Sequence, residues 1–425
     1  MRILIISSNP ISTTDNNGKT LRSFFRQFPK EDLATLYFHP NLKPDFDTCS
    51  NLYRINEINI LKSIFNLSFT AKNTAPKQDD FQIVGKGSNS SLFSHCKNLL
   101  KHLPAFREAL WKLNTWDTDE LNQWISDFKP DIVFAMLGDS IFAHKMALKI
   151  SKRYSIPLAV YFTDDYILND YSSNFIEKRH IAKLRKIYSH TVNNAHLLYA
   201  IGDKMAAAYS NYFGKKFGVL INCIDFSKQV ALEPLKISQD HDIIISYLGG
   251  LHYNRWKSIC RVGRAFRTRK DIHIRVFSGQ QPDDHIMENF HNSGVEFCGS
   301  LTEQEVGREI AKSHFLIHAE SFSPQDKAFT QYSVSTKIPE YMSSNRQIIC
   351  IGPSDIASVE LLEQNGFGIL INEKDTDEEI SNKIIKAIEN YDSFDFKRQY
   401  DFALSKFDKT AIAANLKKDF SSLLD

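Results

Sequence analysis

Short apolar runs recur along the chain, and each is followed by a polar or glycine-containing loop and then by a segment with helical spacing. The clearest runs of the first half lie at 3–6, 131–136, 158–162 and 197–201, and the pattern begins again at 243–248. Strands that alternate with helices are typical of parallel sheets with helices on both faces. Because the pattern occurs twice, the sequence predicts an α/β protein with two doubly wound domains that face a central cleft.

The length of the chain also indicates two domains, because 425 residues are too many for one ordinary hydrophobic core. A polar stretch without a clear period separates the two halves, and we expect the linker there, at 226–242. The predicted N-terminal Rossmann-like domain then covers 1–225 and the C-terminal one covers 243–400. The remaining helical segment, 401–425, is expected to pack back on the N-terminal domain.

The composition excludes several classes of protein. Lysine and arginine total 52 and aspartate and glutamate 50, so the formal charge of +2 lacks the basic excess of a nucleic-acid binder. The six cysteines are scattered without a CxxC pair, which predicts free thiols in a reducing compartment and neither a disulfide nor a zinc framework. No apolar run approaches the roughly 18 residues of a membrane span. We expect a cytoplasmic protein, in solution or held peripherally at the inner face of the membrane.

The stretch at 333–352, SVSTKIPEYMSSNRQIICIG, combines a hydroxyl-rich loop, a short helix and a buried strand. At the junction of loop and helix, Ser335, Thr336 and Lys337 offer hydroxyls, N–H groups and an ammonium group, which together suit a phosphate. Glu340, one turn further on, is placed to accept hydrogen bonds from sugar hydroxyls. The alternative is that Ser335 caps a helix and Lys337 is solvated.

Glycines follow two other predicted strands. Gly249 and Gly250 end the first strand of the second half, and the loop continues as LHYNRWK with Arg255 and Lys257. Gly18 lies in the polar loop after the first strand of the chain. A glycine there lets a phosphate or sugar approach the backbone, or it serves only as a turn residue.

Two adjacent carboxylates, Asp164 and Asp165, follow the strand at 158–162. They are expected at the carboxyl end of that strand, where α/β proteins bind ligands. There they are candidates to accept hydrogen bonds from an acceptor hydroxyl, and one of them to act as a base. The alternative is a turn followed by a helix N-cap.

Two segments with helical spacing, 92–112 and 177–186, have a basic polar face. Such a face favours contact with anionic lipid headgroups. The alternative for both segments is a helix that packs on a sheet and exposes its basic side chains to water.

The chain resembles the GT-B glycosyltransferases, in particular the large retaining family that uses nucleotide-sugar donors. The segment ISYLGGLHYNRWKSI is similar to the family's strand and glycine-rich loop, and STKIPEYMSSNRQIICIG is similar to its LEAMACGKPVVAT segment. The resemblance implies that Gly249, Gly250, Arg255 and Lys257 hold the donor diphosphate. It also places Glu340 on the glutamate that binds the donor ribose. In the N-terminal half, VLINCIDF is similar to the family's vipNGvD segment, and IGDKMAAAY is similar to the strand and helix that precede that segment.

The chain departs from the family at two places. The family's first glutamate, which precedes a GFG loop, is absent at the spacing of that motif, and 333–336 stands in place of the loop. Glu320, which reaches the site through a longer loop, is a candidate substitute. In the N-terminal half, Asp164 and Asp165 stand where the family often has a histidine followed by an aspartate.

The resemblance implies transfer of a hexose from a nucleotide sugar to a saccharide or lipid-linked acceptor, as in bacterial surface-polysaccharide synthesis, with retention of configuration and without a metal or other cofactor. The N-terminal domain would bind the acceptor and the C-terminal domain the donor. Arg255, Lys257 and Lys337 would stabilise the charge that develops on the leaving diphosphate. The alternatives are a nucleotide-sugar epimerase of the same fold and a degenerate scaffold without catalysis.

Overall fold

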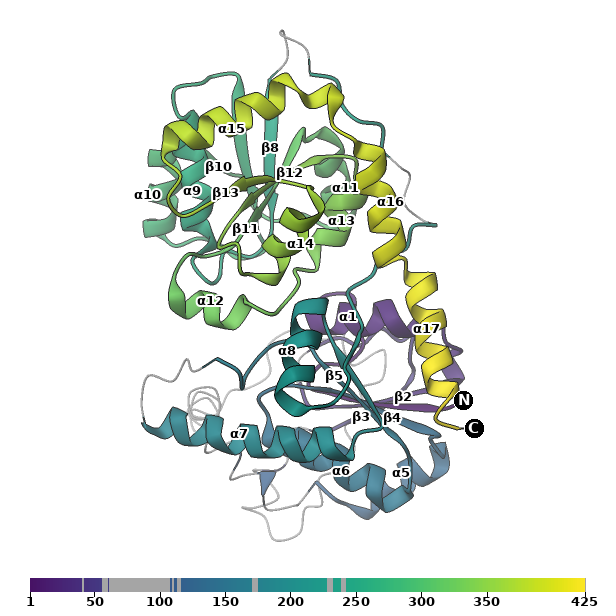
Figure 1. Ribbon diagram of the computed structural model, residues 1–425. Coiled ribbons are helices and arrows are strands. Elements are labelled where there is room, and N and C mark those ends of the chain that lie inside the picture. Colours follow the sequence, from purple (N-terminus) through teal and green to yellow (C-terminus); the bar gives the residue numbers. More distant parts are fainter. Residues whose placement is uncertain are drawn as a thin grey trace, which may run out of the picture. The chain divides into compact units, whose positions relative to one another are not determined.

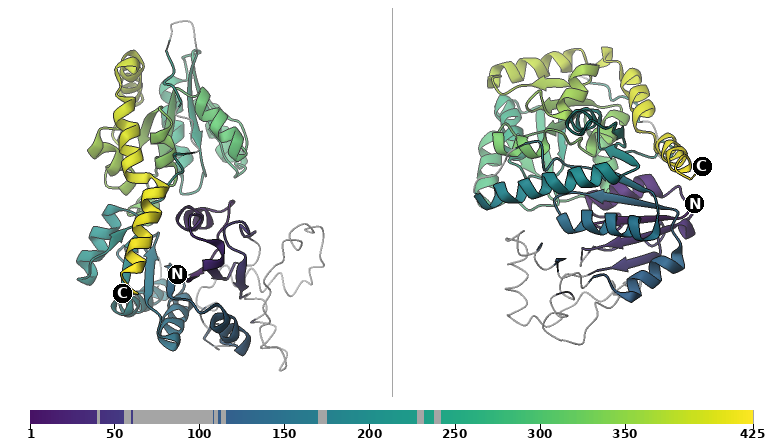
Figure 2. Two further views of the ribbon diagram at one scale, coloured as in Figure 1. Left: turned by 90° about the vertical axis from the view of Figure 1, so that its right-hand side faces the viewer. Right: turned by 60° about the horizontal axis from the view of Figure 1, so that its bottom comes forward.

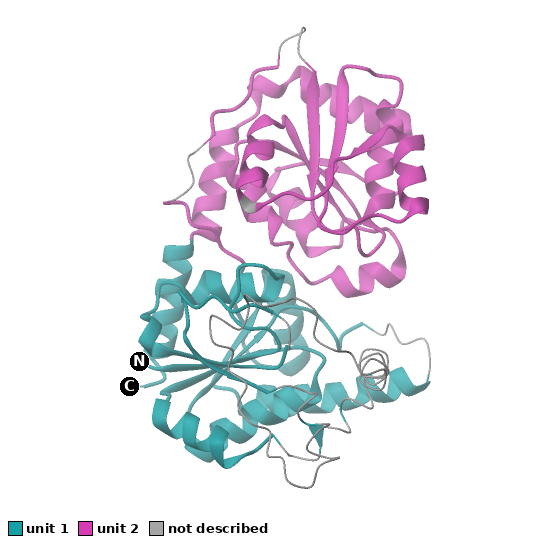
Figure 3. Cartoon of the chain, turned by 180° about the vertical axis from the view of Figure 1, so that it is seen from behind, with its two compact units in different colours: residues 1–221, 409–425 teal, residues 222–408 magenta. Residues whose placement is uncertain are grey.

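The structure is a computed structural model that describes residues 1–39, 42–55, 60, 108, 111–112, 116–169, 175–227, 232–237 and 242–424. The predicted basic helix at 92–112 lies outside these residues except for Glu108, Trp111 and Lys112. The chain forms two compact units, Met1–Ile221 with Lys409–Asp425, and Asn222–Asp408 (Figure 3). The predicted linker, 226–242, therefore falls in the second unit in so far as the structure describes it.

The first unit has a seven-stranded sheet in the order β3-β2-β1-β4-β5-β6-β7, and all its strand pairs are parallel. Helices α6 and α7 pack together on one face of this sheet, and α1 packs with α17 on the other (Figure 1). The elements are β1 (Ile3–Ser7), α1 (Asn16–Phe25), β2 (Leu33–Tyr37), β3 (Asn51–Arg54), α5 (Asp119–Phe128), β4 (Ile132–Leu137), α6 (Ile141–Tyr154), β5 (Leu158–Phe162), α7 (Phe175–Asn194), β6 (Leu197–Ala200), α8 (Asp203–Phe213), β7 (Gly218–Val219) and α17 (Lys409–Ser421).

The second unit has a six-stranded parallel sheet in the order β10-β9-β8-β11-β12-β13. Helix α9 packs with α10 and α15, and α13 packs with α16 (Figure 1). The elements are β8 (Ile243–Leu248), α9 (Arg255–Phe266), β9 (Ile272–Phe277), α10 (Asp284–Ser293), β10 (Val295–Phe297), α11 (Glu303–Lys312), β11 (Phe315–Ala319), α12 (Pro324–Thr330), α13 (Lys337–Ser343), β12 (Gln347–Ile351), α14 (Ala357–Asn365), β13 (Ile369–Ile371), α15 (Asp377–Glu389) and α16 (Phe396–Phe407).

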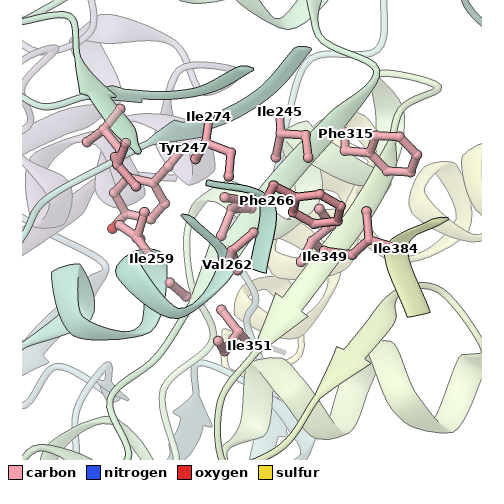
Figure 4. Packing of buried hydrophobic residues seen from close by; sticks show 14 of the residues in the cluster. Ile245, Tyr247, Ile259, Val262, Phe266, Ile274, Phe315, Ile349, Ile351 and Ile384 are labelled. Carbon is pink, nitrogen blue, oxygen red and sulfur yellow. The ribbon is translucent and has the colours of Figure 1, made fainter. Parts of the chain in front are cut away.

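Both sheets have the strand order of a doubly wound nucleotide-binding fold, in which the chain first builds outward from a central strand and then returns to its other side. The predicted fold class, two Rossmann-like doubly wound α/β domains, is therefore confirmed. The core of the second unit shows why these runs are strands. Alternate positions of β8, including Ile245 and Tyr247, and residues of α9, including Ile259 and Val262, pack in one buried cluster (Figure 4).

Gly18 was expected in a polar loop, and the structure places it in the first turn of α1. That helix begins at Asn16, because the Asp15 side chain caps it by accepting a 2.8 Å hydrogen bond from the N–H of Gly18. In the second unit, the chain between β11 and α13 contains helix α12, which starts at Pro324. A capping box of Thr302 and Glu305 is present at the start of α11.

Candidate functional site

The strand order of the second sheet reverses between β8 and β11, since β9 and β10 lie on one side of this pair and β12 and β13 on the other. In open parallel sheets, ligands bind outside the carboxyl ends of the strands at such a switch point. Two loops leave this point, 249–254 between β8 and α9, and 320–323 between β11 and α12. The candidate site is made by these two loops and by α13, which contacts β8.

The loop after β8 requires glycine at its first position. A Cβ atom on Gly249 would lie 2.9 Å from the hydroxyl of Tyr247 and 3.2 Å from Cε of Lys337. The hydroxyl of Tyr247 donates a 2.6 Å hydrogen bond to the carbonyl of Gly250, and the hydroxyl of Tyr341 on α13 bonds the last residue of β8. These contacts bring the first residue of α13, Lys337, against the glycine loop.

Two further residues of this loop have a left-handed backbone, Tyr253 with φ of 56° and Asn254 with φ of 50°. Such conformations cost on the order of 1–3 kcal/mol for non-glycine residues and are often kept at functional sites. The amide of Asn254 donates a 2.8 Å hydrogen bond to Oδ2 of Asp326 on α12, and the hydroxyl of Ser321 donates to the same oxygen at 2.8 Å. The ring of Tyr253 also stacks on Phe329 of α12. Helix α12 therefore holds the loop in its strained conformation.

The first residue of α9 pairs with a buried carboxylate from the loop after β11. Nη2 of Arg255 lies 3.1 Å from Oε2 and 3.3 Å from Oε1 of Glu320, and Nε donates to Oε2 at 3.3 Å. The side chain of Glu320 is 3% exposed and that of Arg255 is 18% exposed. Gly352 makes room for the pair, because a Cβ atom there would lie 2.9 Å from Cβ of Glu320. The positive charge of Arg255 is thus balanced by Glu320 within the second unit.

The same cluster contains a buried histidine. Nε2 of His318 lies 3.5 Å from Oε1 of Glu320. Burial, together with the positive charge of Arg255, lowers the pKa of His318 to about 3. Burial raises the pKa of Glu320, and Arg255 opposes that shift. Because His318 is neutral near neutral pH, the cluster has one guanidinium and one carboxylate.

Two lysines in the first turns of helices add cations to the site. Lys257 is exposed on α9, with Nζ 5.4 Å from the centre of the Trp256 ring. Lys337 is half-buried at the start of α13, and Glu340 is half-buried in the same turn. The N-terminus of a helix attracts anions through its N–H groups and dipole, so the start of α9 and the lysines favour a phosphate.

The hydroxyl-rich residues before α13 make local hydrogen bonds. The N–H of Ser335 donates to the hydroxyl of Ser358 at 2.9 Å, and the hydroxyl of Ser335 accepts from the N–H of Lys337 at 3.4 Å. Thr336 is exposed at the N-cap position, and its side chain does not cap α13. Ser335 thus supports the start of the helix, in keeping with the capping alternative, while Thr336 lies at the surface.

The candidate residues of the first unit have different environments. Asp165 is 1% exposed, and its carboxylate accepts from the N–H groups of Ile167, Leu168 and Asn169 and from the hydroxyl of Tyr209 at 3.0 Å. These bonds make Asp165 the anchor of the loop between β5 and α7, as the turn alternative expects. The neighbouring Asp164 is only partly buried and accepts from the hydroxyl of Thr163 at 3.0 Å.

Gly18 is buried inside α1 and lies under the loop that precedes the helix. A Cβ atom there would lie 2.5 Å from Oδ2 of Asp15, 2.6 Å from Cβ of Ser12 and 2.7 Å from the carbonyl oxygen of Pro10. The close approach of the chain to itself thus explains why glycine is required at this position.

The second unit also has a pocket of about 520 Å³ that is separate from the candidate site. Its lining includes Gln347 and Ile348, which begin β12, and Lys383 and Lys386 of α15. Because β12 begins there, the pocket lies at the amino edge of the sheet, opposite to the edge where Gly249 and Glu320 lie.

The structure thus brings Gly249, Lys337, Arg255 and Glu320 together at one sheet edge, whereas Gly18, Asp164 and Asp165 belong to the first unit. Sequence reasoning missed the residues that support this edge, namely Tyr247, Tyr253, Asn254, His318, Ser321, Asp326, Tyr341 and Gly352. One signal was available, because serine followed by proline, at 323–324, is typical of a helix start. The left-handed conformations of Tyr253 and Asn254 had no comparable signal.

In the described part of the chain, no group of three or more His, Cys, Asp and Glu side chains is placed to hold a metal ion. The helices described by the structure include none that is long and apolar enough to cross a membrane.

No family model matches the chain, and no curated protein matches its sequence. Solved structures do match over its whole length. HepE of Anabaena, in complex with UDP and glucose, superposes with a TM-score of 0.62 at 13% identity, over 99% of this chain and 100% of that chain. A glycosyltransferase of Rickettsia africae superposes with a TM-score of 0.62 at 11% identity, over 100% of this chain and 99% of that chain.

A protein of Listeria monocytogenes described as a UDP-N-acetylglucosamine 2-epimerase also superposes, with a TM-score of 0.53 at 10% identity, over 100% of this chain and 97% of that chain. The chain therefore has the GT-B fold, as its sequence predicted. At these identities the likeness establishes the fold, which transferases and epimerases share.

Proposed function

We propose that this chain is a glycosyltransferase that moves a hexose from a nucleotide sugar to a saccharide or lipid-linked acceptor, in the synthesis of a surface polysaccharide or glycoconjugate. The observation that carries the proposal is the contact between Lys337 and the Gly249 loop at the switch point of the second sheet. The diphosphate of a nucleotide sugar suits this sheet edge, because the edge combines an ammonium group, a glycine turn and the start of α9. HepE, whose fold this chain shares, was solved with UDP and glucose.

In the proposed reaction the bond between the sugar and the diphosphate breaks, and negative charge develops on the leaving phosphate. Lys337 and Lys257 stabilise this charge. Arg255 contributes hydrogen-bond donors and little net charge, because Glu320 balances it. Glu340 accepts hydrogen bonds from the ribose, and Ser335 and Thr336 contact the phosphates. Retention of configuration and independence from metal ions are proposed from the resemblance in sequence.

The first unit is proposed to bind the acceptor. Of its two candidate carboxylates, Asp164 is the one we assign to the acceptor hydroxyl, because Asp165 is occupied by backbone N–H groups. Replacement of Asp164 by Asn should lower the rate of transfer and leave donor affinity unchanged. Replacement of Asp165 by Asn should instead destabilise the first unit.

We further propose that the protein acts in the cytoplasm, at the inner face of the membrane. Three of its free cysteines, Cys49, Cys260 and Cys350, are buried thiols, which fit a reducing compartment. The basic segment 177–186 is part of α7. Flotation with anionic vesicles at low salt should recover the protein, and no flotation would contradict the membrane proposal.

The experiment that tests the donor site is a thermal-shift screen against UDP-, GDP-, dTDP- and CMP-sugars, since a ligand stabilises the folded state by mass action. With the donor so found, Lys337→Ala should weaken binding by about tenfold, through the loss of roughly one charge-assisted contact. Gly249→Ala should also weaken it, because the added methyl group crowds Tyr247 and Lys337. The matched control is Gly307→Ala in α11, where a Cβ atom meets nothing within 4 Å. Equal affinity of all variants would reject the site.

The epimerase alternative is tested on the same samples. Nuclear magnetic resonance spectra of the donor incubated with the protein, without an acceptor, should show an unchanged nucleotide sugar. Accumulation of an epimer would replace the transferase proposal. Failure of all the nucleotide sugars to bind would favour the degenerate scaffold.

A further inference from the structure

The first unit has a pocket of about 530 Å³ at the contact of α6 and α7. This volume is in the range of small-molecule sites. Its walls include the first turns of α6, with Ile141 and Lys145, and most of α7, together with Glu108 and Lys112. None of the residues assigned above to the donor or to the acceptor hydroxyl lines this pocket.

The pocket has a strong excess of positive charge. Among the described residues, five cations and one carboxylate line it, and this carboxylate, Glu108, accepts a 2.7 Å hydrogen bond from the N–H of Ile141 at the start of α6. A carboxylate at the N-terminus of a helix is stabilised by the helix dipole. The five cations, all exposed, are Lys112, Lys145, Arg179, Lys183 and Lys186.

The pocket also has an apolar end. Phe175 and Ile176, the first residues of α7, are 75% and 69% exposed, the highest values among the large apolar side chains of the described residues. Both line the pocket, as does Ile187. Exposed apolar side chains that gather at one place, beside polar ones, are typical of a binding surface.

The spacing along α7 explains why these side chains gather. Phe175, Arg179, Lys183 and Lys186 follow one another at intervals of four, four and three residues, so they lie on one face of the helix. The apolar residue comes first and the cations follow it along the helix axis. A ligand that lies along this face would meet hydrocarbon at one end and positive charge at the other.

We infer that this pocket binds a single amphiphile with a phosphate head, its phosphate against Arg179, Lys183 and Lys186 and its hydrocarbon chain against Phe175 and Ile176. Arginine binds phosphate through paired hydrogen bonds, and lysine through its charge. A flat anionic bilayer requires only a basic surface, whereas an open hollow of this volume, with cations along it and an apolar end, suits the head and the chain of one molecule. If the proposed function holds, the acceptor is a saccharide linked to a lipid phosphate or diphosphate, and this interpretation rests on that function.

The test is calorimetric titration of the full chain with dodecyl phosphate below its critical micelle concentration. We expect binding, and we expect Lys183→Glu and Arg179→Glu to weaken it by at least about tenfold. Phe175→Ser should weaken it in proportion to the lost apolar contact. The matched control is Lys178→Glu, which makes the same change of charge on an exposed residue of α7 that does not line the pocket, and it should retain the affinity of the unchanged protein.

Two further titrations distinguish the contribution of the phosphate head to the affinity from that of the hydrocarbon chain. Inorganic phosphate and dodecyl maltoside, which has the same chain on an uncharged head, should each bind at least about tenfold more weakly than dodecyl phosphate, because each lacks one of the two contacts. Equal affinity for inorganic phosphate would make this an anion site, and equal affinity for the maltoside an apolar site. Either result overturns the inference.

Two other results would contradict the binding of a single amphiphile in this pocket. An equal loss of affinity in Lys178→Glu would assign the effect to the general field of the basic helix. Flotation on phosphatidylglycerol vesicles without any binding of dodecyl phosphate would assign the cations to a membrane surface. Nucleotide-sugar binding, measured by thermal shift on the same variants, should be unchanged. Failure of donor binding alone rejects the proposed function and leaves the lipid-phosphate site standing.

Discussion

The positive charge of Arg255 is compensated by Glu320, which lies 65 residues further along the chain. Glu320 holds the guanidinium by three hydrogen bonds in a buried position, so each charge is compensated only while the other is present. Removing one member of a buried pair leaves an uncompensated charge, which is more costly than removing both.

Replacement of Glu320 by Ala should therefore lower the free energy of unfolding by about 3 kcal/mol, and the double variant Arg255→Met, Glu320→Met should recover most of that loss. Urea denaturation at neutral pH measures both. A single variant that loses less than about 1 kcal/mol, the value of an exposed pair, would show that water reaches the two charges.

His144 is a second buried residue whose protonation matters. It has no exposed surface, and its ring is bonded to the Thr191 hydroxyl at 2.9 Å and to the Gly138 carbonyl at 3.0 Å. Burial lowers the pKa of His144 to about 4, opposed by its hydrogen bond to Gly138. In the neutral ring that burial favours, Nε2–H donates to the carbonyl and Nδ1 accepts from the hydroxyl.

The stability that this neutral ring contributes should be fully present above pH 6.5 and lost as pH falls toward 4, because the unfolded chain binds a proton in that window and the folded chain does not. We expect a loss of about 1.4 kcal/mol per pH unit from this residue in the lower part of the window. Urea denaturation of His144→Gln should show a weaker pH dependence than the unchanged protein. The exposed His190 provides the control, since His190→Gln should preserve the dependence.

At the scale of secondary-structure elements, Arg346 joins the ends of three segments of the second unit. It is 1% exposed, and its guanidinium donates to the carbonyls of Ile310 and Ala311 in the last turn of α11, and to those of Glu233 and Asn345. Carbonyls at the end of a helix carry partial negative charge, so they stabilise a cation. Burial nevertheless lowers the pKa of Arg346.

Replacement of Arg346 by Met should remove the guanidinium donor from these four carbonyls, of which that of Ile310 also accepts from the N–H of Ser313. It should destabilise the second unit by about 3 kcal/mol, since each unsatisfied group costs about 1–3 kcal/mol and some of them find other partners. Arg346→Lys should recover little of this loss, because an ammonium group cannot reach carbonyls on three segments at once. Thermal unfolding followed by circular dichroism checks the order of the three proteins. Equal stability of the lysine variant would contradict the geometric requirement.

The sequence predicted the strands and helices better than the contacts between side chains that are distant in the chain. The strands around β1, β4, β5, β8 and β12 were predicted because apolar runs of this length, bounded by glycine or polar residues, have few other uses. Helix α12 was missed because its seven residues, Pro324–Thr330, are too few for a hydrophobic period to be recognised. The pairing of Arg255 with Glu320, and the bonds that occupy Asp165, depend on packing between distant segments. Composition and spacing do not encode those distances.

At the scale of the whole molecule, the last helices divide between the two units at 408–409. Helix α16 belongs to the second unit, where Phe402 packs on Phe367 with ring centres 5.3 Å apart. Helix α17 belongs to the first, beside α1 and near both chain termini (Figures 1 and 2). The expected C-terminal segment began at 401. Asp408, with an extended backbone, ends α16, and the two helices pack on different partners, α16 on Phe367 and α17 on Phe28.

Helix α17 should be essential to the stability of the first unit. Phe420 has no exposed surface and packs on Phe28 and Phe134, with ring centres 6.5 and 6.1 Å apart. Replacement of Phe420 by Ala should lower the free energy of unfolding of the first unit by about 3 kcal/mol through the cavity it leaves. Leu424→Ala, at a side chain 47% exposed near the same end, should change it by less than about 0.5 kcal/mol. Differential scanning calorimetry of the two variants measures this difference. Similar shifts in both would mean that α17 contributes little to the packing of the first unit.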